Sequence, residues 1–267
     1  GEIVNGLNIS LKGSFEDRRV LENTTDFSIF KTSSVYTDNI PDNIYLETGQ
    51  NPLHSIRDMK HYEILAALSY TPFQRYRVYN GNKIAAGSDW PTFIFTWIHG
   101  YNLYEELSSP LRQSDKFRLE ASKRKDIGAF GEFRWRVRAG TYLDNSHVSY
   151  YDFFHFNSQP IPLLISEYQD AFMLPSYYSM STPEMFGEAH VKYTTPYLLL
   201  KLLPVLSNTL MRENLSFAFL ASRHSNAYTE LGYSISELMF IGEVGVYVGF
   251  ENLRYSSIGG KIVFKFD

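Results

Sequence analysis

A row of arginines at every second position is the strongest chemical signal in the sequence. Arg134, Arg136 and Arg138 alternate with apolar residues in the segment EFRWRVRAGTYL, residues 132–143. Residues two apart in a β-strand point to the same face, so the three guanidinium groups share one side. In the preceding segment, Arg118 lies on the face opposite Phe117 and Leu119.

Two interpretations of this basic row are open. It can attract anions, or it can be neutralised within a network of paired and water-bridged charges. The acids available for such a network are Glu120, Glu188, Glu230 and Glu243. We favour the network, because charged side chains are expected on a face in contact with water.

The histidines do not predict a metal site. His147 and His155 lie near Asp152 in the segment 144–184. A bound metal needs three or four convergent ligands with supporting hydrogen bonds, and this spacing supplies no such set. The sequence contains no cysteine, which excludes thiolate ligands and disulfides. We expect neither a metal nor a cofactor.

Catalytic signatures are also absent from the sequence. Ser222 and His224 are close along the chain, but their spacing defines no triad with a polar residue to orient the histidine. No glycine-rich phosphate loop precedes a helix. We therefore expect no catalytic residues and a protein that is not an enzyme.

The segment 144–184 has an unusual composition for a solvated loop. It contains nine Tyr and Phe residues and no Lys or Arg. Either the rings pack the loop into a plug or cap, which we favour, or they form a docking surface for a partner. The rings that define this prediction are Tyr150, Tyr151, Phe153, Phe154, Phe156, Tyr177 and Tyr178. We expect Asp152, Glu167 and Asp170 to meet the arginine row.

Composition places these residues in a membrane β-protein. The 267 residues include 20 Tyr and 20 Phe, yet the mean hydropathy is only -0.25. No stretch of about 20 apolar residues exists, as a transmembrane helix would need. A net charge of -4 gives no signature of nucleic-acid binding. No secretory signal opens the chain, and we expect a mature or truncated product.

Period-two alternation predicts about ten antiparallel strands. Most are long enough to cross a bilayer, whereas strands of a soluble β-sandwich, the alternative fold, are usually shorter. We expect Phe133, Trp135, Val137, Val244, Val246 and Val248 to face lipid and the arginine row to face the lumen of a barrel. The predicted strands lie near residues 7–12, 62–70, 93–98, 116–122, 132–143, 188–193, 214–221, 230–235, 243–250 and 261–266.

The connections between these strands indicate a membrane orientation. If consecutive strands alternate in direction, the longest connections, about residues 24–57 and 144–184, fall on one side, which predicts extracellular loops. The connection 195–213 is long for the opposite side. We interpret its apolar middle as a short amphipathic helix at the periplasmic interface.

The order of segments resembles a known family. PTFIFTWIHGY (91–101), KFRLEAS (116–122), FGEAHVKYTTPYLLLKLLPVL (186–206) and GGKIVFKF (259–266) occur in this order. Together they resemble a Bacteroidota outer-membrane family in which a carboxypeptidase-regulatory-like domain precedes a BamA-like C-terminal β-barrel. The resemblance implies an all-β fold in which residues 1–267 supply about ten C-terminal strands of a transmembrane antiparallel barrel of about sixteen strands. Ten strands cannot enclose such a barrel, so we expect an open sheet, or a barrel completed by residues outside this sequence.

One feature of the BamA-like superfamily is missing. The resemblance implies that segment 144–184 corresponds to the sixth extracellular loop, whose tip carries an Arg-Gly-Phe or Arg-Gly-Tyr motif. That arginine contacts an acidic residue on the next strand but one. Segment 144–184 has no basic residue, and the candidate partner strand 214–221 has no acid.

A barrel without this latch suggests a scaffold rather than an insertase. We expect a non-enzymatic accessory subunit in outer-membrane protein biogenesis or surface-protein export, located in the outer membrane of a Gram-negative bacterium. Its expected partners are the lipid bilayer with lipopolysaccharide and other outer-membrane proteins, such as a BamA-type assembly complex, and no nucleic acid. The alternative is a transport barrel, either a channel or a two-partner-type secretion pore.

Overall fold

The computed structural model describes residues 1–21, 40–49, 51, 54–104, 111–164, 170–202, 209–223, 225–238 and 242–264. Within these residues the protein is an all-β structure dominated by one large sheet. The helical elements are single turns, and none of the described helices is long and apolar enough to cross a membrane. They are α1 (Ile44–Glu47) and the 3-10 turns η2 (Gly128–Phe130), η3 (Tyr150–Asp152) and η4 (Leu200–Leu202).

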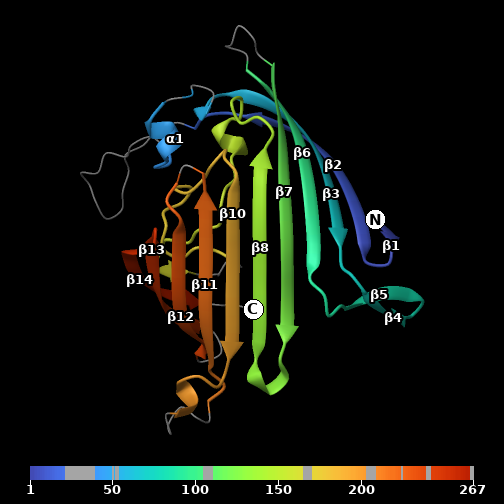
Figure 1. Cartoon of the computed structure of the whole chain (residues 1–267), viewed down its shortest axis with the longest axis vertical. Helices are drawn as coiled ribbons and strands as arrows, with labels where there is room; N and C mark the ends of the chain where they lie inside the picture. The colour runs from blue at the N-terminus through green and yellow to red at the C-terminus, as the bar shows by residue number, and fades with distance from the viewer. Residues whose placement is uncertain are drawn as a thin grey trace.

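Ten long antiparallel strands make up most of the sheet (Figure 1). Each pairs with its neighbour along the chain, apart from the short elements inserted between them. Within the described residues, each of the ten segments predicted from alternation lies in a strand, which confirms the all-β part of the prediction; residues 265 and 266 of the last segment lie outside the described residues. They are β2 (Leu7–Arg18), β3 (Met59–Tyr70), β6 (Thr92–Leu103), β7 (Leu111–Asp126), β8 (Glu132–Tyr142), β10 (Phe186–Thr195), β11 (Arg212–Ser222), β12 (Tyr228–Leu238), β13 (Gly242–Glu251) and β14 (Arg254–Phe264).

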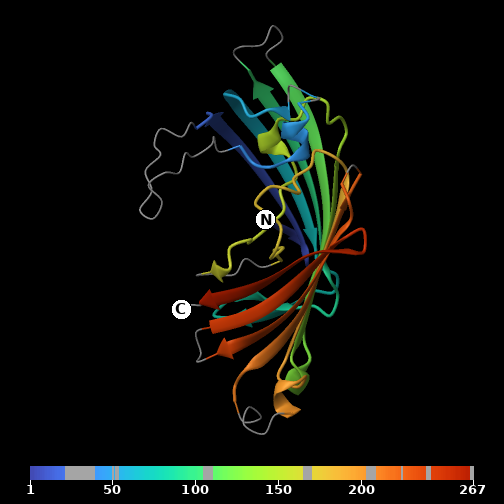
Figure 2. The same cartoon turned by 90° about the vertical axis from the view of Figure 1, so that its left-hand side faces the viewer.

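Two short strands extend the edges of this sheet. β1 (Glu2–Val4) pairs antiparallel with β2, and β9 (Leu163–Leu164) pairs in parallel with β14. Between these edges the sheet is open, because β2 and β14 do not pair with each other. Figure 2 shows the sheet as a curved wall with a concave and a convex side. An open sheet agrees with the expectation for ten strands, and closure into a barrel is not seen.

A separate hairpin was not predicted. β4 (Arg75–Tyr79) and β5 (Asn82–Gly87) form their own two-stranded sheet between β3 and β6. Its turn, Asn80–Gly81, has positive φ at both residues, 48° and 76°. Asn-Gly between two short strands is the preferred sequence for such a two-residue turn, so the signal was present in the sequence.

The antiparallel order places the two longest connections at the same end of the sheet. The chain leaves β2 at Arg18 and re-enters β3 at Met59, and it leaves β8 at Tyr142 and re-enters β10 at Phe186. Both connections lie at the upper end in Figure 1. The predicted amphipathic helix in 195–213 is represented at the opposite end by the single turn η4, and residues 203–208 lie outside the described residues.

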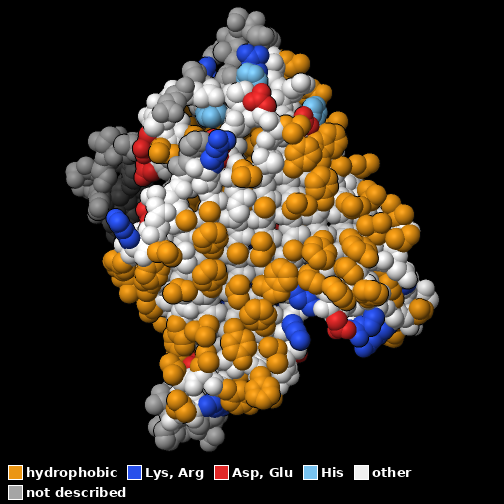
Figure 3. Space-filling view, viewed as in Figure 1, with side chains coloured by type: hydrophobic (Ala, Val, Ile, Leu, Met, Phe, Trp, Pro, Cys, Tyr) orange, Lys and Arg blue, Asp and Glu red, His pale blue; other side chains and the backbone are white. Residues whose placement is uncertain are grey.

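The two faces of the sheet differ in chemistry. Figure 3 views the convex face, where apolar side chains spread over the strands and charged side chains lie toward the ends. Exposed apolar residues come from strands all along the sheet. They include Phe93, Phe95, Leu119, Val137, Leu215, Phe217, Leu231, Val244, Val246 and Ile262. Alternation therefore leaves the polar positions of these strands on the concave face.

Candidate functional site

Loop 144–184, the connection between β8 and β10, folds over the concave face (Figure 2). Its described parts, 144–164 and 170–184, contribute most residues of the buried apolar cluster. From the loop this cluster takes Val148, Tyr150, Phe153, Phe154, Phe156 and Phe172, and from the strands it takes Tyr142, Phe186, Ala218, Leu220 and Tyr228. The aromatic composition of the loop is thus explained by packing against the sheet.

The seven aromatic residues singled out from the sequence divide into two groups. Tyr150, Phe153, Phe154 and Phe156 are buried, and Tyr151 is half-buried. Tyr177 and Tyr178 remain exposed, by 46% and 49% respectively. The first group forms the core of the loop, and the second leaves two rings available at its surface.

The absence of a side chain at Gly140 of β8 allows the Phe154 ring of the loop to approach the sheet. A Cβ atom at Gly140 of β8 would lie 2.6 Å from the Phe186 ring and 2.8 Å from the Phe154 ring. The two rings contact each other, with centroids 4.6 Å apart. Glycine at position 140 therefore makes room for the loop to pack directly on the sheet.

Asp152 holds the start of the loop at the upper end of the concave face. Its carboxylate pairs with Arg18 of β2 at 2.6 Å and accepts a hydrogen bond from the Asn102 amide of β6 at 2.7 Å. Its backbone carbonyl accepts from Lys116 of β7 at 2.8 Å and from the Tyr142 hydroxyl. The prediction that Asp152 meets the arginine row is wrong, because η3 places it beside β2, β6 and β7 instead.

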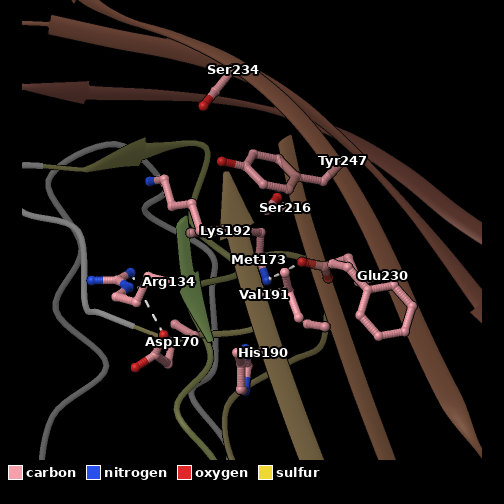
Figure 4. A pocket seen from close by; sticks show the side chains of 13 residues that line it. Arg134, Asp170, Met173, His190, Val191, Lys192, Ser216, Glu230, Ser234 and Tyr247 are labelled. Atoms are coloured by element: carbon pink, nitrogen blue, oxygen red, sulfur yellow. Dashed lines mark hydrogen bonds and ion pairs between the residues drawn. The ribbon is translucent and has the colours of Figure 1, made fainter. Parts of the chain in front are cut away.

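Asp170 does meet the arginine row. Its carboxylate lies 3.6 Å from Arg134 Nη2 and 3.5 Å from Arg136 Nη1, and Figure 4 shows the contact with Arg134. The third arginine, Arg138, pairs instead with Glu188 of β10, its Nε lying 2.6 Å from the carboxylate. Glu167, the other acid predicted to meet the row, lies outside the described residues.

Glu230 of β12 fixes the returning part of the loop. Its carboxylate accepts hydrogen bonds from the backbone N–H groups of Met173 at 2.8 Å and Leu174 at 3.0 Å, and from the Tyr228 hydroxyl at 2.9 Å. Beside this contact, a Cβ atom at Gly259 of β14 would lie 2.7 Å from Leu174. The sheet thus accommodates both the backbone and the Leu174 side chain of the loop.

The middle of the loop reaches the far edge of the sheet. β9 pairs with β14 through Leu163 and Leu164, and the Ile262 N–H donates to the Pro162 carbonyl at 2.8 Å. Lys261 of β14 donates to the Pro160 carbonyl at 2.7 Å and to the Ile161 carbonyl at 3.1 Å. Contacts from β2 to β14 therefore hold the loop across the whole concave face.

The remaining inward acids have different partners. Glu188 accepts from His190 at 2.8 Å as well as from Arg138, and Glu243 lies 3.7 Å from Lys192. Both carboxylates are almost completely buried. The side chain of Glu120 makes no ion pair or hydrogen bond with the other described residues. The network predicted from the sequence is thus partly formed, with Glu230 serving the loop backbone rather than a base.

The contact at Glu230 anchors the loop to the sheet. An acidic side chain of β12 holds the loop through two backbone N–H groups of the loop. Sequence reasoning could not find this contact, because backbone donors leave no residue signature. It had assigned Glu230 only to charge neutralisation.

Glu213 at the start of β11 is another buried carboxylate that binds backbone N–H groups, and the sequence alone did not single it out. It is fully buried and accepts hydrogen bonds from the N–H groups of Leu198 at 2.9 Å, Leu199 at 2.8 Å and Leu200 at 3.2 Å. The Tyr233 hydroxyl donates to it at 2.7 Å. These bonds fix the polypeptide that enters η4 at the end opposite the long loops.

Burial perturbs the titratable groups of the loop. Desolvation raises the pKa of the Tyr150 hydroxyl to about 12, so this phenol stays protonated. Desolvation also lowers the pKa of His155, whose Nδ1 is hydrogen-bonded to the Ser181 hydroxyl at 2.8 Å. The same cause lowers the pKa of His54, which packs edge-on against Phe153. Both imidazoles are therefore neutral at physiological pH.

The cavity enclosed where the loop packs on β10, β11 and β12 is small. The cavity in Figure 4, lined by Arg134, Asp170, Met173, His190, Lys192 and Glu230, measures about 30 Å³, which is room for a water molecule. Among the residues that the structure describes, no group of three or more His, Asp or Glu side chains is arranged to hold a metal ion. Ser222 bonds to the Ser225 hydroxyl at 2.7 Å, and His224 lies outside the described residues.

Comparison with known proteins gives one match. The model of the C-terminal domain of a family of unknown function, DUF5686, matches residues 1–235. No curated protein and no solved structure matches the chain.

Proposed function

From the premise that the chain belongs to the DUF5686 family of unknown function, as its C-terminal domain, we propose that it is a non-enzymatic outer-membrane β-barrel protein. In this proposal it acts as an accessory or scaffold subunit in outer-membrane protein biogenesis or surface-protein export. The observation that carries the proposal is the way loop 144–184 is fixed across the concave face.

The convex face supports a location in lipid. Strands of 10 to 16 residues are long enough to cross a bilayer, and their outward positions are apolar from β3 to β14. In water, an exposed apolar surface of this extent would be a liability for aggregation. In an outer membrane the same surface faces hydrocarbon, and the aromatic and charged side chains near the strand ends face the headgroups and water.

The open edges support a larger barrel. Open sheet edges that face lipid leave backbone groups without partners and do not occur in membrane proteins. The edges of β2 and β14 must therefore be paired in the membrane. A BamA-like barrel of about sixteen strands, with this chain supplying ten, satisfies them. A carboxypeptidase-regulatory-like domain ahead of the barrel is part of the same proposal.

The fixed loop favours a scaffold over a pore. Two charged side chains of the sheet bond to the loop backbone: Glu230 accepts from the Met173 N–H, and Lys261 donates to the Pro160 carbonyl. A loop held by its backbone fills the lumen and blocks free diffusion. Tyr177 and Tyr178, exposed at the surface of the same loop, are the residues that we assign to contact with other outer-membrane proteins.

The second candidate function is a transport barrel. Asp170 lies 3.5 and 3.6 Å from the two arginines that it contacts, and this observation favours the transport role. Ion contacts at these distances are weaker than charge-assisted hydrogen bonds, which measure about 2.7–2.9 Å. A segment held so loosely can move aside and open a path through the lumen.

Site-specific crosslinking in living cells tests the proposal. A photoreactive amino acid replaces Tyr177 or Tyr178 in the full-length protein, and Phe153, which is 1% exposed, serves as the matched buried control. We expect crosslinks from positions 177 and 178 to outer-membrane assembly or export proteins and none from position 153. Fractionation of the protein into the cytoplasm, or an absence of crosslinks together with a steady conductance in lipid bilayers, would contradict the accessory role.

A further inference from the structure

A second, larger cavity lies on the concave side toward the end opposite the long loops. It measures about 530 Å³ and is bordered by β7, β8, the residues flanking the β4–β5 hairpin, and Asp170 of the loop. Its charged lining consists of four basic side chains, Lys123, Arg124, Arg134 and Arg136, and two acidic ones, Glu120 and Asp170. The neutral polar lining, such as Thr92 and Ser122, supplies hydroxyl donors.

Arg124 pairs with Glu132 at 2.6 Å, whereas the other two arginines of this cavity lack adequate partners. Arg134 and Arg136 share one carboxylate, that of Asp170, at 3.6 and 3.5 Å. Neither guanidinium donates a hydrogen bond to any of the described residues, and Arg136 Nε and Nη2 are buried without a partner. Each guanidinium carries five N–H donors, and buried donors in folded proteins are nearly always satisfied. The arrangement is therefore incomplete as a purely internal ion pair.

The geometry of the lining indicates the class of anion. Guanidinium groups bind the oxygens of phosphate in a bidentate manner, and two neighbouring guanidiniums can bind one tetrahedral dianion together. Arg134 and Arg136 are two residues apart on one strand face, with Ser122 of β7 directly opposite Arg136. The cavity volume exceeds the space that one anion needs, which leaves room for the group esterified to it.

We propose that this cavity binds a phosphate group, either as free phosphate or as the headgroup of a phosphate ester, with Arg134 and Arg136 as its main ligands. Asp170 then acts as a tethered competitor, because its carboxylate occupies the site when phosphate is absent. The site depends on the concave face being in contact with water, and it is compatible with both the scaffold and the transport role.

Titration calorimetry of the full-length protein in detergent tests this site with two probes, inorganic phosphate and glycerol 3-phosphate. We expect both probes to bind the wild type and Arg136→Gln to weaken binding by about tenfold or more, because one bidentate ligand is lost. Asp170→Asn should strengthen binding several-fold, because it removes the competitor. Arg75→Gln, at an exposed arginine on the hairpin paired with Asp89, is the matched control and should leave binding unchanged.

The two probes distinguish the source of the phosphate. Tighter binding of glycerol 3-phosphate than of inorganic phosphate supports an esterified headgroup, and equal binding supports the free anion. The proposal would be overturned if neither probe binds the wild type or Asp170→Asn. It would also be overturned if Arg136→Gln folds normally by circular dichroism and binds phosphate as tightly as the wild type. Neither result bears on the crosslinking test of the accessory role.

Discussion

Substitution of Glu230 by glutamine should release the returning part of loop 144–184. The carboxylate accepts two backbone N–H bonds, from Met173 and Leu174. An amide of the same shape keeps one acceptor oxygen, so one bond is lost and the other is no longer charge-assisted. Hydrogen bonds to charged groups contribute about 1.5–3 kcal/mol and neutral ones about 1 kcal/mol, so we expect local opening to become easier by about 3 kcal/mol.

Such a change corresponds to roughly a hundredfold larger opening equilibrium. Hydrogen–deuterium exchange of the peptide that spans Met173 and Leu174 measures it, because these amides exchange only when the segment opens. Glu251→Gln makes the same chemical change at an exposed end of β13 and should leave that exchange unaltered. If Glu230→Gln exchanges at the wild-type rate in this peptide, the latch described here does not hold the loop.

Three further predictions follow from packing, facing and protonation. Gly140→Ala should destabilise the loop by about 1–3 kcal/mol in thermal unfolding, since its Cβ would overlap the Phe154 and Phe186 rings, whereas Gly187→Ala, with nothing within 4 Å, should be neutral. Val246→Arg on the convex face should lower the free energy of unfolding by about 2–4 kcal/mol, measured with denaturant in lipid vesicles, because this position is proposed to lie in hydrocarbon. Val78→Arg, on the exposed hairpin, should change it little. Equally small effects of both variants would contradict the proposal that the convex face contacts lipid. Because burial lowers the pKa of His155 and of His54, the unfolded chain takes up protons at a higher pH than the folded chain does. The stability of the loop should therefore decline as pH falls below about 6.5. Near-ultraviolet circular dichroism should show this decline in the wild type and not in the His54→Gln/His155→Gln double variant.

The sheet was predictable because alternation records which face each residue occupies. Arg134, Arg136 and Arg138 define one strand face by themselves, and the register of β8 with β10 places Arg138 opposite Glu188. Strand ends were less predictable. Glu213 precedes the clear alternation of β11, so its strand was predicted to begin one residue later, without an acid.

The contacts of the loop were only partly predictable. Its aromatic content indicated packing, and Phe153, Phe154 and Phe172 are buried, as expected of a folded loop. The partner of each acid was less certain, because it depends on where the chain runs in three dimensions. Asp170 reached the arginine row, whereas Asp152 pairs with Arg18, which is far from it in the sequence. The hairpin turn at Asn80–Gly81 had a clear local signal that the search for long strands passed over.

Single-channel recording in planar lipid bilayers tests the central claim most directly, namely that loop 144–184 fills the lumen of a membrane barrel. The full-length protein is compared with a variant in which residues 146–181 are replaced by a short Gly-Ser linker, and with Glu230→Gln. The account predicts silence for the wild type, brief openings for Glu230→Gln, and a steady conductance once the loop is removed. A large, steady conductance from the intact wild-type protein would contradict it.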